Sequence, residues 1–512
     1  MTDANLYSRL AGRFSGASRR RFGLLPDGRH YTYADLNRVS GRYANALVAL
    51  GVAPGDRVAV QVEKSIEALT LYLGTLRAGA VFLPLNTAYT PPEVAYFLSD
   101  AEPAAFVCDP GRAEALAPVA AKAGARLESM GGHRDGGRPE GSLAERAEAA
   151  GEDFATVARG PDDLAAILYT SGTTGRSKGA MLTHENLWSN AATLCDHWRF
   201  TRDDVLLHAL PIFHTHGLFT SSNTLMAAGG AMIFLPKFDA DEVIRWLPEA
   251  TAKMGVPTFY TRLLDHPKFT RELVSHIRLF VCGSAPLLAE THRAFEERTG
   301  HRILERYGMT ETNMNTSNPY DGERRAGTVG LPLQGVELRI TEPETGKVLG
   351  PGETGMIEVR GPNVFKGYWR NPEKTAEDIR PDGFFITGDL GVVGTDGYVS
   401  IVGRAKDLII SGGFNVYPKE IEEAIDDLPG VEESAVIGVP HPDFGEGVVA
   451  VVVPRKGAEL SEEAVIAGLR DSLARFKQPK RVFVLDALPR NAMGKVQKKD
   501  LRERFAGVFS GP

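Results

Sequence analysis

Hydrophobic residues follow two alternating periods along the first hundred residues. A helical spacing runs through residues 36–50 and 66–77, residues 56–62 alternate as in a strand, and 80–85 form a short apolar run. Strands that alternate with helices of this length are typical of a mostly parallel sheet covered by helices. The same alternation returns between residues 204 and 306. We therefore expect an α/β fold with a large N-terminal domain built from parallel α/β subdomains.

Two changes of pattern divide the rest of the chain. Residues 327–403 are dense in glycine, proline and valine at short spacing, which predicts a β-rich subdomain. After a junction at 404–408, helix and strand signals alternate again over 409–512, with a helical pattern over 461–474. That length suits a small independent unit. The expected organisation is an N-terminal domain at 1–403 and a small α+β C-terminal domain.

Composition narrows the class of protein. The chain has 512 residues, more than one compact core normally holds, which agrees with two domains. A net charge of −7 without a long basic run disfavours nucleic acid as a partner. Three cysteines without metal-ligand spacing argue against a disulfide framework and a zinc site. No apolar run approaches the ~20 residues that cross a bilayer, and the first residues lack the apolar centre of a secretory signal. We expect a cytoplasmic protein without membrane contact, with organelle targeting as the minor alternative.

The densest candidate chemistry lies in Tyr169-Thr-Ser-Gly-Thr-Thr-Gly-Arg-Ser-Lys-Gly179, between a strand signal and a helical pattern that starts at Thr183. Glycine lets backbone N–H groups approach a ligand closely, and the hydroxyls and Lys178 add donors, which suits a polyphosphate. The spacing is not the Walker pattern Gly-x4-Gly-Lys-Ser/Thr, so an ordinary P-loop NTPase is disfavoured. A flexible surface loop is the alternative.

This run resembles the phosphate-binding signature of the AMP-forming acyl-CoA synthetases, the adenylating superfamily that also contains firefly luciferase and peptide-synthetase adenylation domains. Residues 76–85 resemble an earlier signature of the same superfamily. The resemblance implies an ATP site along the run. The residues to which it assigns phosphate contacts are Thr170, Ser171, Gly172, Thr173, Thr174, Gly175 and Lys178.

The turn Tyr307-Gly-Met-Thr-Glu-Thr312 follows a predicted strand. The resemblance implies that Thr310 contacts the α-phosphate and that Glu311 binds Mg²⁺, for which a carboxylate is a usual ligand. In isolation, a Thr–Glu pair is more often solvated. Two segments are further implied in nucleotide binding by the resemblance, and they comprise Gly283, Ser284, Ala285, Glu305, Arg306, Tyr307, Gly308 and Met309.

Later motifs follow in the family's order. By resemblance, Asp389 accepts hydrogen bonds from the ribose hydroxyls of ATP, with an ordinary turn aspartate as the alternative. Arg404 corresponds to a ribose or phosphate contact, and Lys406 to the hinge, at 404–408, about which a mobile C-terminal domain swings. Gly412 and Gly413 lie where the family lets the pantetheine arm of coenzyme A pass close to the backbone, which glycine permits.

Lys495 ends the motif Pro489-Arg-Asn-Ala-Met-Gly-Lys495. By resemblance it reaches over the adenylation site, where an ammonium stabilises the charge that develops as carboxylate and α-phosphate meet. A solvated lysine in a basic tail is the alternative. In Phe213-His-Thr-His-Gly217, His214 matches the family's aromatic gate beside the acyl pocket. His216, two residues on, is expected to face away from it.

Arg262 carries the prediction about the acid. It lies in Met254-Gly-Val-Pro-Thr-Phe-Tyr-Thr-Arg262, a segment that lines the acyl pocket in relatives. An unpaired buried cation is costly, but a guanidinium opposite a second carboxylate forms a bidentate pair. Arg262 and residues 305–318 resemble the malonyl-CoA synthetases, and we place Ser284 and the bulky Met309 at the acid as well. A solvated helix arginine is the alternative.

The resemblance covers the chain from about residue 30 to 500 and implies an ATP-dependent acid–thiol ligase. It implies that malonate, with methylmalonate as a second acid, and coenzyme A yield malonyl-CoA, AMP and pyrophosphate through an acyl-adenylate, with Mg²⁺. Three rivals stay open: a ligase for another short carboxylic acid, an adenylating enzyme that loads a carrier protein, and a luciferase-like oxygenase. A non-catalytic nucleotide-binding protein is disfavoured because Lys178, Glu311 and Lys495 are all present.

Overall fold

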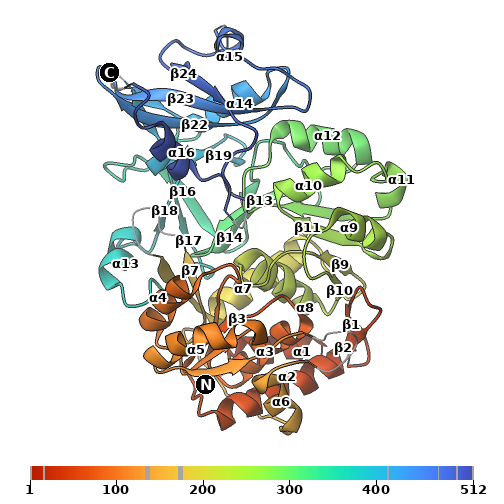
Figure 1. Ribbon diagram of the computed structural model, residues 1–512. Coiled ribbons are helices and arrows are strands. Elements are labelled where there is room, and N and C mark those ends of the chain that lie inside the picture. Colours follow the sequence, from red (N-terminus) through yellow and green to blue (C-terminus); the bar gives the residue numbers. More distant parts are fainter. Residues whose placement is uncertain are drawn as a thin grey trace.

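The computed structural model describes residues 3–14, 18–132, 139–170, 177–411, 414–470, 472–491 and 494–509. A small C-terminal lobe, blue in Figure 1, lies above a larger body that the rest of the chain forms. The body contains two mainly parallel sheets and one antiparallel sheet, and the lobe contains a mixed sheet. The expected α/β class, with a large N-terminal and a small C-terminal domain, is confirmed.

The first sheet has the strand order β6-β5-β3-β4-β7-β8, and its neighbours are parallel except for the hairpin β7–β8. Its strands are β3 (Arg57–Gln61), β4 (Val81–Pro84), β5 (Ala105–Cys108), β6 (Arg126–Ser129), β7 (Leu164–Thr170) and β8 (Lys178–Thr183). The helices of this part are α1 (Leu6–Phe14), α2 (Tyr33–Ala49), α3 (Ile66–Arg77), α4 (Pro91–Ala101), α5 (Ala113–Lys122) and α6 (Ser142–Ala149). A capping box between Thr32 and Asp35 begins α2, as the helical pattern indicated.

The second sheet runs β15-β14-β13-β12-β11-β9-β10-β1-β2 in the described part of the chain. It is parallel from β1 to β13 and antiparallel at both edges. Its strands are β1 (Arg21–Leu24), β2 (His30–Thr32), β9 (Val205–His208), β10 (Ala231–Phe234), β11 (Ala252–Gly255), β12 (Leu279–Cys282), β13 (Leu304–Met309), β14 (Asn313–Ser317) and β15 (Leu331–Pro332). The helices beside it are α7 (His184–His197), the π-helix η3 (His216–Asn223), α8 (Thr224–Ala228), α9 (Ala240–Trp246), α10 (Pro257–Leu264), α11 (Arg271–Val274) and α12 (Ala289–Thr299).

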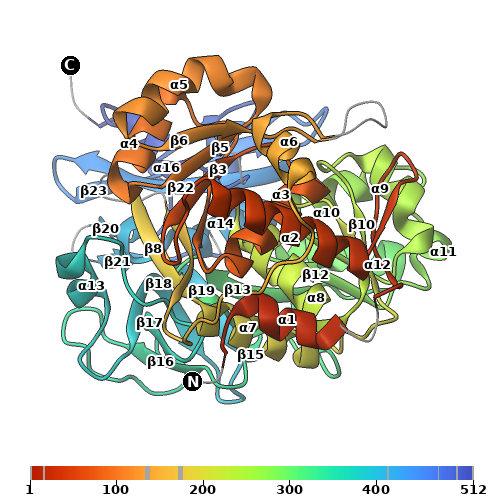
Figure 2. The ribbon, with the colours of Figure 1, turned by 90° about the horizontal axis from the view of Figure 1, so that it is seen from below.

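A continuous apolar core joins these two sheets. Every residue of α3 is buried in it, which explains why that helix is apolar on most of its faces. Figure 2 shows α1 beside α7 and α8, and the backbone N–H of Leu6 donates to His184 Nδ1 at 3.0 Å. The first helix thus closes the core on that side.

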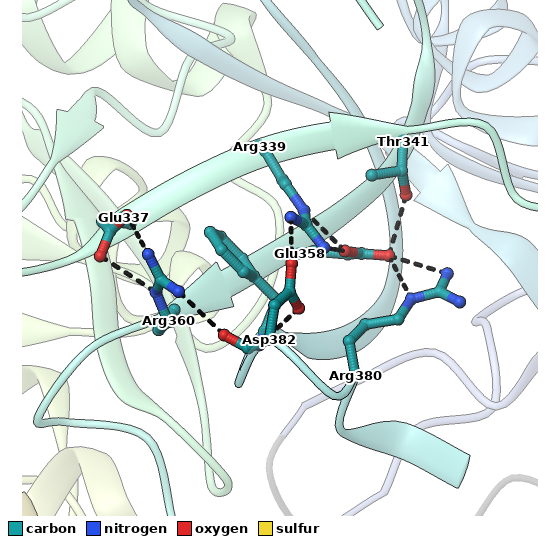
Figure 3. Close-up of polar contacts among 8 residues, drawn as sticks. Glu337, Arg339, Thr341, Glu358, Arg360, Arg380 and Asp382 are labelled. Carbon is teal, nitrogen blue, oxygen red and sulfur yellow. Dashed lines mark hydrogen bonds and ion pairs between the residues drawn. The ribbon is translucent and has the colours of Figure 1, made fainter. Parts of the chain in front are cut away.

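The antiparallel sheet is held together by one buried carboxylate. Its strands are β16 (Glu337–Thr341), β17 (Gly355–Arg360), β18 (Phe385–Val393) and β19 (Val399–Arg404), and α13 (Pro372–Asp378) precedes β18. Glu358 is fully buried and accepts hydrogen bonds from Arg339, Thr341 and Arg380 at 2.9–3.0 Å (Figure 3). A buried charge is stable only when paired in this way. Because Arg380 lies between α13 and β18, Glu358 fixes the path of the chain between them.

The C-terminal lobe contains β20 (Ile409–Ser411), β21 (Phe414–Val416), β22 (Val431–His441), β23 (Gly445–Pro454) and β24 (Arg481–Val484), with α14 (Pro418–Asp426), α15 (Glu462–Gly468) and α16 (Lys498–Phe505). The pattern over 461–474 predicted a longer helix than α15. The start at Ser461 is right, because its side chain caps the helix. The helix ends at Gly468, where close packing against Leu428 leaves no room for a side chain.

Polar contacts join the lobe to the body. The 3₁₀ turn η5 (Ala405–Asp407) connects them, and its Asp407 pairs with Arg502 of α16 at 2.6 Å. Lys419 Nζ donates to the carbonyl of Ile401 at 2.7 Å. Across the lobes, Glu290 pairs with Arg455. Among the described residues, no helix is long and apolar enough to span a membrane.

Candidate active site

The predicted site residues gather at one edge of the second sheet. Strands β9, β11, β12 and β13 are parallel, so their carboxyl ends share this edge. Ligands of open α/β sheets bind outside such ends. Gly283–Ala285 follow β12 and Thr310 and Glu311 follow β13, while β18 and β19 supply Asp389 and Arg404.

Glu311 lies in the turn between β13 and β14 and is buried. Its carbonyl accepts from Phe365 N at 2.7 Å, and its Oε1 accepts from the Tyr368 hydroxyl at 3.2 Å. Burial raises the pKa of this carboxyl, while Arg404 and Lys178 lower it. The result is a shielded carboxylate oxygen with cations nearby.

Lys178 begins β8 and points toward the same place. Its Nζ lies 4.0 Å from Asp378 Oδ2 and 4.4 Å from the centre of the Tyr368 ring. Thr170, at the end of β7, pairs with Lys178 across the hairpin. The predicted helix start at Thr183 is right, but a strand, β8, precedes it. Five predicted phosphate-contact residues lie outside the described residues: Ser171, Gly172, Thr173, Thr174 and Gly175.

Asp389 is a buried carboxylate on β18 with two strong donors. The Tyr307 hydroxyl donates to its Oδ2 at 2.5 Å, and Arg404 Nε lies 2.6 Å from its Oδ1. Asp389 and Arg404 face each other in the β18–β19 register, so the sheet sets this pair. Burial and Asp389 raise the pKa of Tyr307, which keeps that phenol protonated as a donor. The arrangement presents an oriented carboxylate at the sheet edge.

Lys495 reaches this group of residues from the C-terminal lobe. Its side chain remains accessible, yet protein atoms surround it closely enough to lower the pKa of the amine, and Arg404 lowers it further. Asp389 and Glu311 oppose that shift. The lobe therefore brings an ammonium to the carboxylates of the body.

Arg306 is buried, and among the described residues its Nε and Nη2 have no hydrogen-bond partner. Burial lowers its pKa to about 10, so the guanidinium stays charged near neutral pH. A Cβ at Gly283 would lie 2.5 Å from Arg306 Cζ, so only glycine fits there. Next to it, Ser284 has a φ of 74°, a strained conformation for a residue with a side chain. Such a cation is ready to receive an anion.

His216 is part of this group, and the expectation that it faces away is wrong. It opens the π-helix η3, and its Nδ1 lies 3.0 Å from Ser284 Oγ. Its Nε2 is buried without a hydrogen-bond partner in the described structure. His214 lies beside it, and burial, Lys495 and Arg306 lower the pKa of His214 to about 3. Burial also lowers the pKa of His216 well below its ordinary value, so both rings are neutral near pH 7. The side chains of His214 and His216 do not alternate as predicted, because the chain enters a π-helix at His216.

Arg262 does not join the group. It lies on α10 with an exposed side chain, and no hydrogen bond or ion pair ties it to the described residues. The buried residues of that helix are Tyr260 and Leu263, so Arg262 falls off the buried face. Arg262 is thus exposed rather than buried, and its contact with the acid stays a prediction. The buried arginine of the group is Arg306.

The other predicted nucleotide-contact residues lie near the same edge. Glu305 is buried with its Oε2 unbonded within the described structure, and burial raises its pKa to about 7. Ala285, Met309 and Thr310 are half-buried. At Gly308, a Cβ would lie 1.8 Å from the carbonyl of Asn313, so the tight turn into β14 requires glycine.

In the lobe connection, Lys406 lies in η5 with an exposed side chain. Gly412 and Gly413 lie outside the described residues. Sequence reasoning missed Tyr368 and Asp378, which contact Glu311 and Lys178. No local signal marks them, since they come from a segment about sixty residues beyond the magnesium turn.

Two family models match the chain. The AMP-binding enzyme model matches residues 15–369, and the AMP-binding enzyme C-terminal domain model matches residues 420–495. A feruloyl-CoA synthase of Amycolatopsis sp is 39% identical over 478 residues, which cover 93% of this chain and 94% of that protein. A malonate–CoA ligase of Arabidopsis thaliana is 34% identical over 533 residues, covering 94% and 86%.

Among solved structures, ATP-bound MatB from Rhodopseudomonas palustris is 60% identical, with coverage of 99% of this chain and 100% of that chain and a TM-score of 0.97. The apo structure of the same MatB gives a TM-score of 0.86 at equal identity and coverage. The arrangement of lobe and body described above is thus nearer to the ATP-bound form. With both domain models matched in order and the site residues gathered at one sheet edge, the chain belongs to the AMP-binding enzyme family.

Proposed function

We propose that the protein is an ATP-dependent ligase that converts malonate and coenzyme A to malonyl-CoA, AMP and pyrophosphate, with methylmalonate as a second acid. In the first half-reaction an acid oxygen attacks the α-phosphorus of ATP, and pyrophosphate leaves. In the second, the coenzyme A thiolate attacks the acyl carbon, and AMP leaves with the electrons of the broken bond. The observation that carries the choice of acid is the buried, unpaired guanidinium of Arg306 beside Ser284.

The nucleotide would lie along the body. Lys178 would meet the phosphates and release Asp378, and the carboxylate of Asp389 would accept from the ribose hydroxyls, with Arg404 holding it in place. Thr310 would contact the α-phosphate. The residues of the Thr170–Gly175 run retain their proposed phosphate contacts, and Gly283–Ala285 and Glu305–Met309 their proposed nucleotide contacts, except that Arg306 is reassigned to the acid.

Glu311 fits Mg²⁺ by its chemistry, because it is a buried carboxylate with a free oxygen edge beside cationic groups. Among the described residues, no group of three or more histidine, cysteine or acidic side chains is arranged to hold a metal ion. The protein would thus supply few ligands, and the phosphates the rest. When bound, Mg²⁺ would neutralise phosphate charge.

Lys495 would supply mobile charge for the first half-reaction. Its ammonium stabilises the negative charge that builds up as acid and α-phosphate meet, which is a large catalytic contribution when the group is prepositioned. The second half-reaction needs room for the thiol. A rotation of the C-terminal domain, proposed at 409–512, about a hinge at 404–408 with Lys406 would remove Lys495 and present Gly412 and Gly413 to coenzyme A.

The acid would lie between Ser284, Met309 and Arg306, with His214 beside it. A second carboxylate would satisfy the two guanidinium nitrogens that lack partners, and such charge-assisted bonds are the strong ones. An uncharged acyl chain would leave the buried cation unpaired, which is costly. A dicarboxylate therefore suits this place better than a fatty or aromatic acid.

A second candidate is an aromatic acid, because a feruloyl-CoA synthase is 39% identical to the chain and a malonate–CoA ligase 34%, although MatB, at 60%, is more similar than either. Overall identity reflects the shared nucleotide machinery, whereas the acid is chosen by a few side chains. The unpaired Arg306 is the reason to rank ferulate below malonate.

The experiment is acid-dependent ATP consumption in the presence of coenzyme A, with malonate, methylmalonate, succinate, acetate and ferulate compared. We expect the highest kcat/KM with malonate. A preference for ferulate or acetate would keep the ligase reaction and overturn the choice of acid. ATP consumption without coenzyme A dependence, or with oxygen uptake, would instead favour a carrier-loading enzyme or an oxygenase.

A further inference from the structure

Hydrogen bonds join the described residues on either side of Lys495. Asn491 N donates to the Lys495 carbonyl at 3.0 Å, and Lys495 N donates back to Asn491 Oδ1 at 3.0 Å. Gln497 N donates to the Pro489 carbonyl at 2.8 Å. These hydrogen bonds join residues of this segment only to one another. They do not set the direction in which the segment presents the Lys495 side chain.

Arg490 ties the first flank of this turn to strand β22 of the lobe. One guanidinium nitrogen donates to the carbonyl of Gly494, directly before Lys495, and the other pairs with Glu433 of β22. The Arg490 side chain is 31% exposed and the Glu433 side chain 25%. A single planar group, half sheltered from water, therefore links β22 to the neighbour of Lys495.

Lys498 ties the second flank to a helix. It begins α16, and its Nζ lies 2.6 Å from Glu422 Oε1 on α14. The same oxygen accepts from Val436 N of β22 at 2.7 Å. Both side chains of the pair are less than one-fifth exposed. Glu422 therefore joins α14, β22 and the segment after Lys495.

A third acid, Asp426, lies near Glu422 and Glu433. Asp426 of α14 is buried, and burial, followed by Glu422 and Glu433, raises its pKa to about 8. Near neutral pH it is mostly protonated, so two carboxylates face two cations and the charges balance. We call Glu422, Glu433, Arg490 and Lys498 the turn clamp.

We propose that Glu433 and Glu422 are positioning residues for Lys495, which act through Arg490 and Lys498 to fix where the turn delivers its ammonium. The proposal rests on the role proposed above for Lys495 in adenylation. Partly exposed ion pairs contribute little to stability. A catalytic group that moves by about 1 Å can nonetheless cost about 100-fold in rate. The clamp should therefore affect the first half-reaction far more than folding.

The test measures the two half-reactions separately. Malonate-dependent ATP–pyrophosphate exchange reports adenylation, and coenzyme A-dependent consumption of supplied acyl-adenylate reports thioester formation. We expect Glu433→Gln and Glu422→Gln each to lower the exchange kcat by about 5- to 50-fold, with the KM for malonate and thioester formation changed by about twofold or less. Glu433→Asp should retain more exchange activity than Glu433→Gln, because it keeps the charge.

The matched control is Glu462→Gln. Glu462 pairs with Arg481 at 2.9 Å and also accepts from Val482 N at 3.0 Å, so it resembles Glu422 in its bonding but touches neither flank of the turn. It should leave exchange unchanged. Equal losses in both half-reactions, or equal losses in the control, would mean a structural role and overturn the proposal.

Lys495→Ala in the same assays tests the role proposed for Lys495 separately from the role proposed for the turn clamp. If that variant keeps its exchange activity, the role proposed for Lys495 fails. If it loses exchange while the Glu433 and Glu422 variants do not, the role of Lys495 stands and the clamp is refuted.

Discussion

The two sides of the active site are fixed by different means. On the body, Glu311, Asp389 and Arg306 are buried and held by neighbouring strands and turns. On the lobe, Lys495 is accessible and is held by a surface turn and its ion pairs. The buried residues of the body, which we call the fixed wall, should keep their geometry when the lobe moves. An exposed turn on the lobe can move away from the site with the lobe. The difference matches the proposed reaction, in which adenylation needs Lys495 and thioester formation needs it withdrawn.

Removing the ammonium of Lys495 should give the largest difference between the two half-reactions. We expect Lys495→Ala to reduce the adenylation kcat by about 100- to 1,000-fold, because a prepositioned charge at a developing phosphoryl anion is lost. Thioester formation from supplied acyl-adenylate should change by only a few-fold, since that step takes place with the lysine withdrawn. Stopped assays of the two half-reactions measure this, and equal losses in both would contradict the division of labour.

A substitution in the fixed wall should instead damage nucleotide binding. Asp389→Asn removes the charge that Tyr307 and Arg404 hold, so we expect kcat/KM for ATP to fall by about 10- to 100-fold, as for lost hydrogen bonds to a charged group. The KM for the acid should stay close to that of the unmodified protein. Tyr307→Phe removes one donor and keeps the charge, so its effect should be smaller. An unchanged KM for ATP in Asp389→Asn would refute the ribose contact.

The lobe should also respond to pH through Asp426. Its pKa is 3.8 in a free chain and about 8 in the fold, so the unfolded chain loses this proton first as pH rises. The free energy of unfolding therefore falls between about pH 4 and pH 8 and is flat above. Asp426→Asn removes this loss, and we expect its Tm to exceed that of the unmodified protein by about 2–4 °C at alkaline pH and by less in acid. Calorimetry at two pH values measures this, and a lower Tm of the variant at alkaline pH would contradict it.

The smallest effect should come from the contacts between lobe and body. Glu290 and Arg455 are about half exposed, and Arg293 lies 3.7 Å from Asp427, also exposed, so added salt screens both pairs. We expect adenylation to fall by about twofold between low and high salt, where the Debye length shortens to a few ångströms. Glu290→Gln should mimic that loss and reduce the salt response. The same salt response in this variant would argue against these contacts.

Much of the fold could be predicted because periodicity is a local signal. The βα alternation identified the parallel sheets, and the helical spacing over 36–50 located α2, whose first turn the structure adds. Strand β8 was missed because it follows a polar glycine-rich run and is only six residues long. The helix at 461–474 was predicted too long because its apolar spacing continues past Gly468, where α15 ends beside the Leu428 side chain.

The site was predictable where a motif fixes both residue and backbone, as at Glu311 and Asp389. It was not predictable where distant segments meet. Arg262 sits in a recognisable motif, but the buried face of α10 passes through Tyr260 and Leu263 and leaves it outside. Arg306 was named for the nucleotide, yet two adjacent charged residues, Glu305 and Arg306, within a predicted strand were already a sign of an unusual role. The contact of His216 with Ser284 depends on a π-helix, which no simple period reveals.

The central claim is that Arg306, a buried residue of the body, determines the specificity for the acid. Its most direct test is the ratio of kcat/KM for malonate to that for propionate, which has nearly the same shape without the second carboxylate. In Arg306→Met we expect this ratio to fall by about 10- to 100-fold, through loss of malonate rather than general loss of activity. Arg262→Ala, which removes an exposed arginine, should leave the ratio unchanged. A ratio that survives in Arg306→Met and collapses in Arg262→Ala would contradict the account and return the second carboxylate to Arg262.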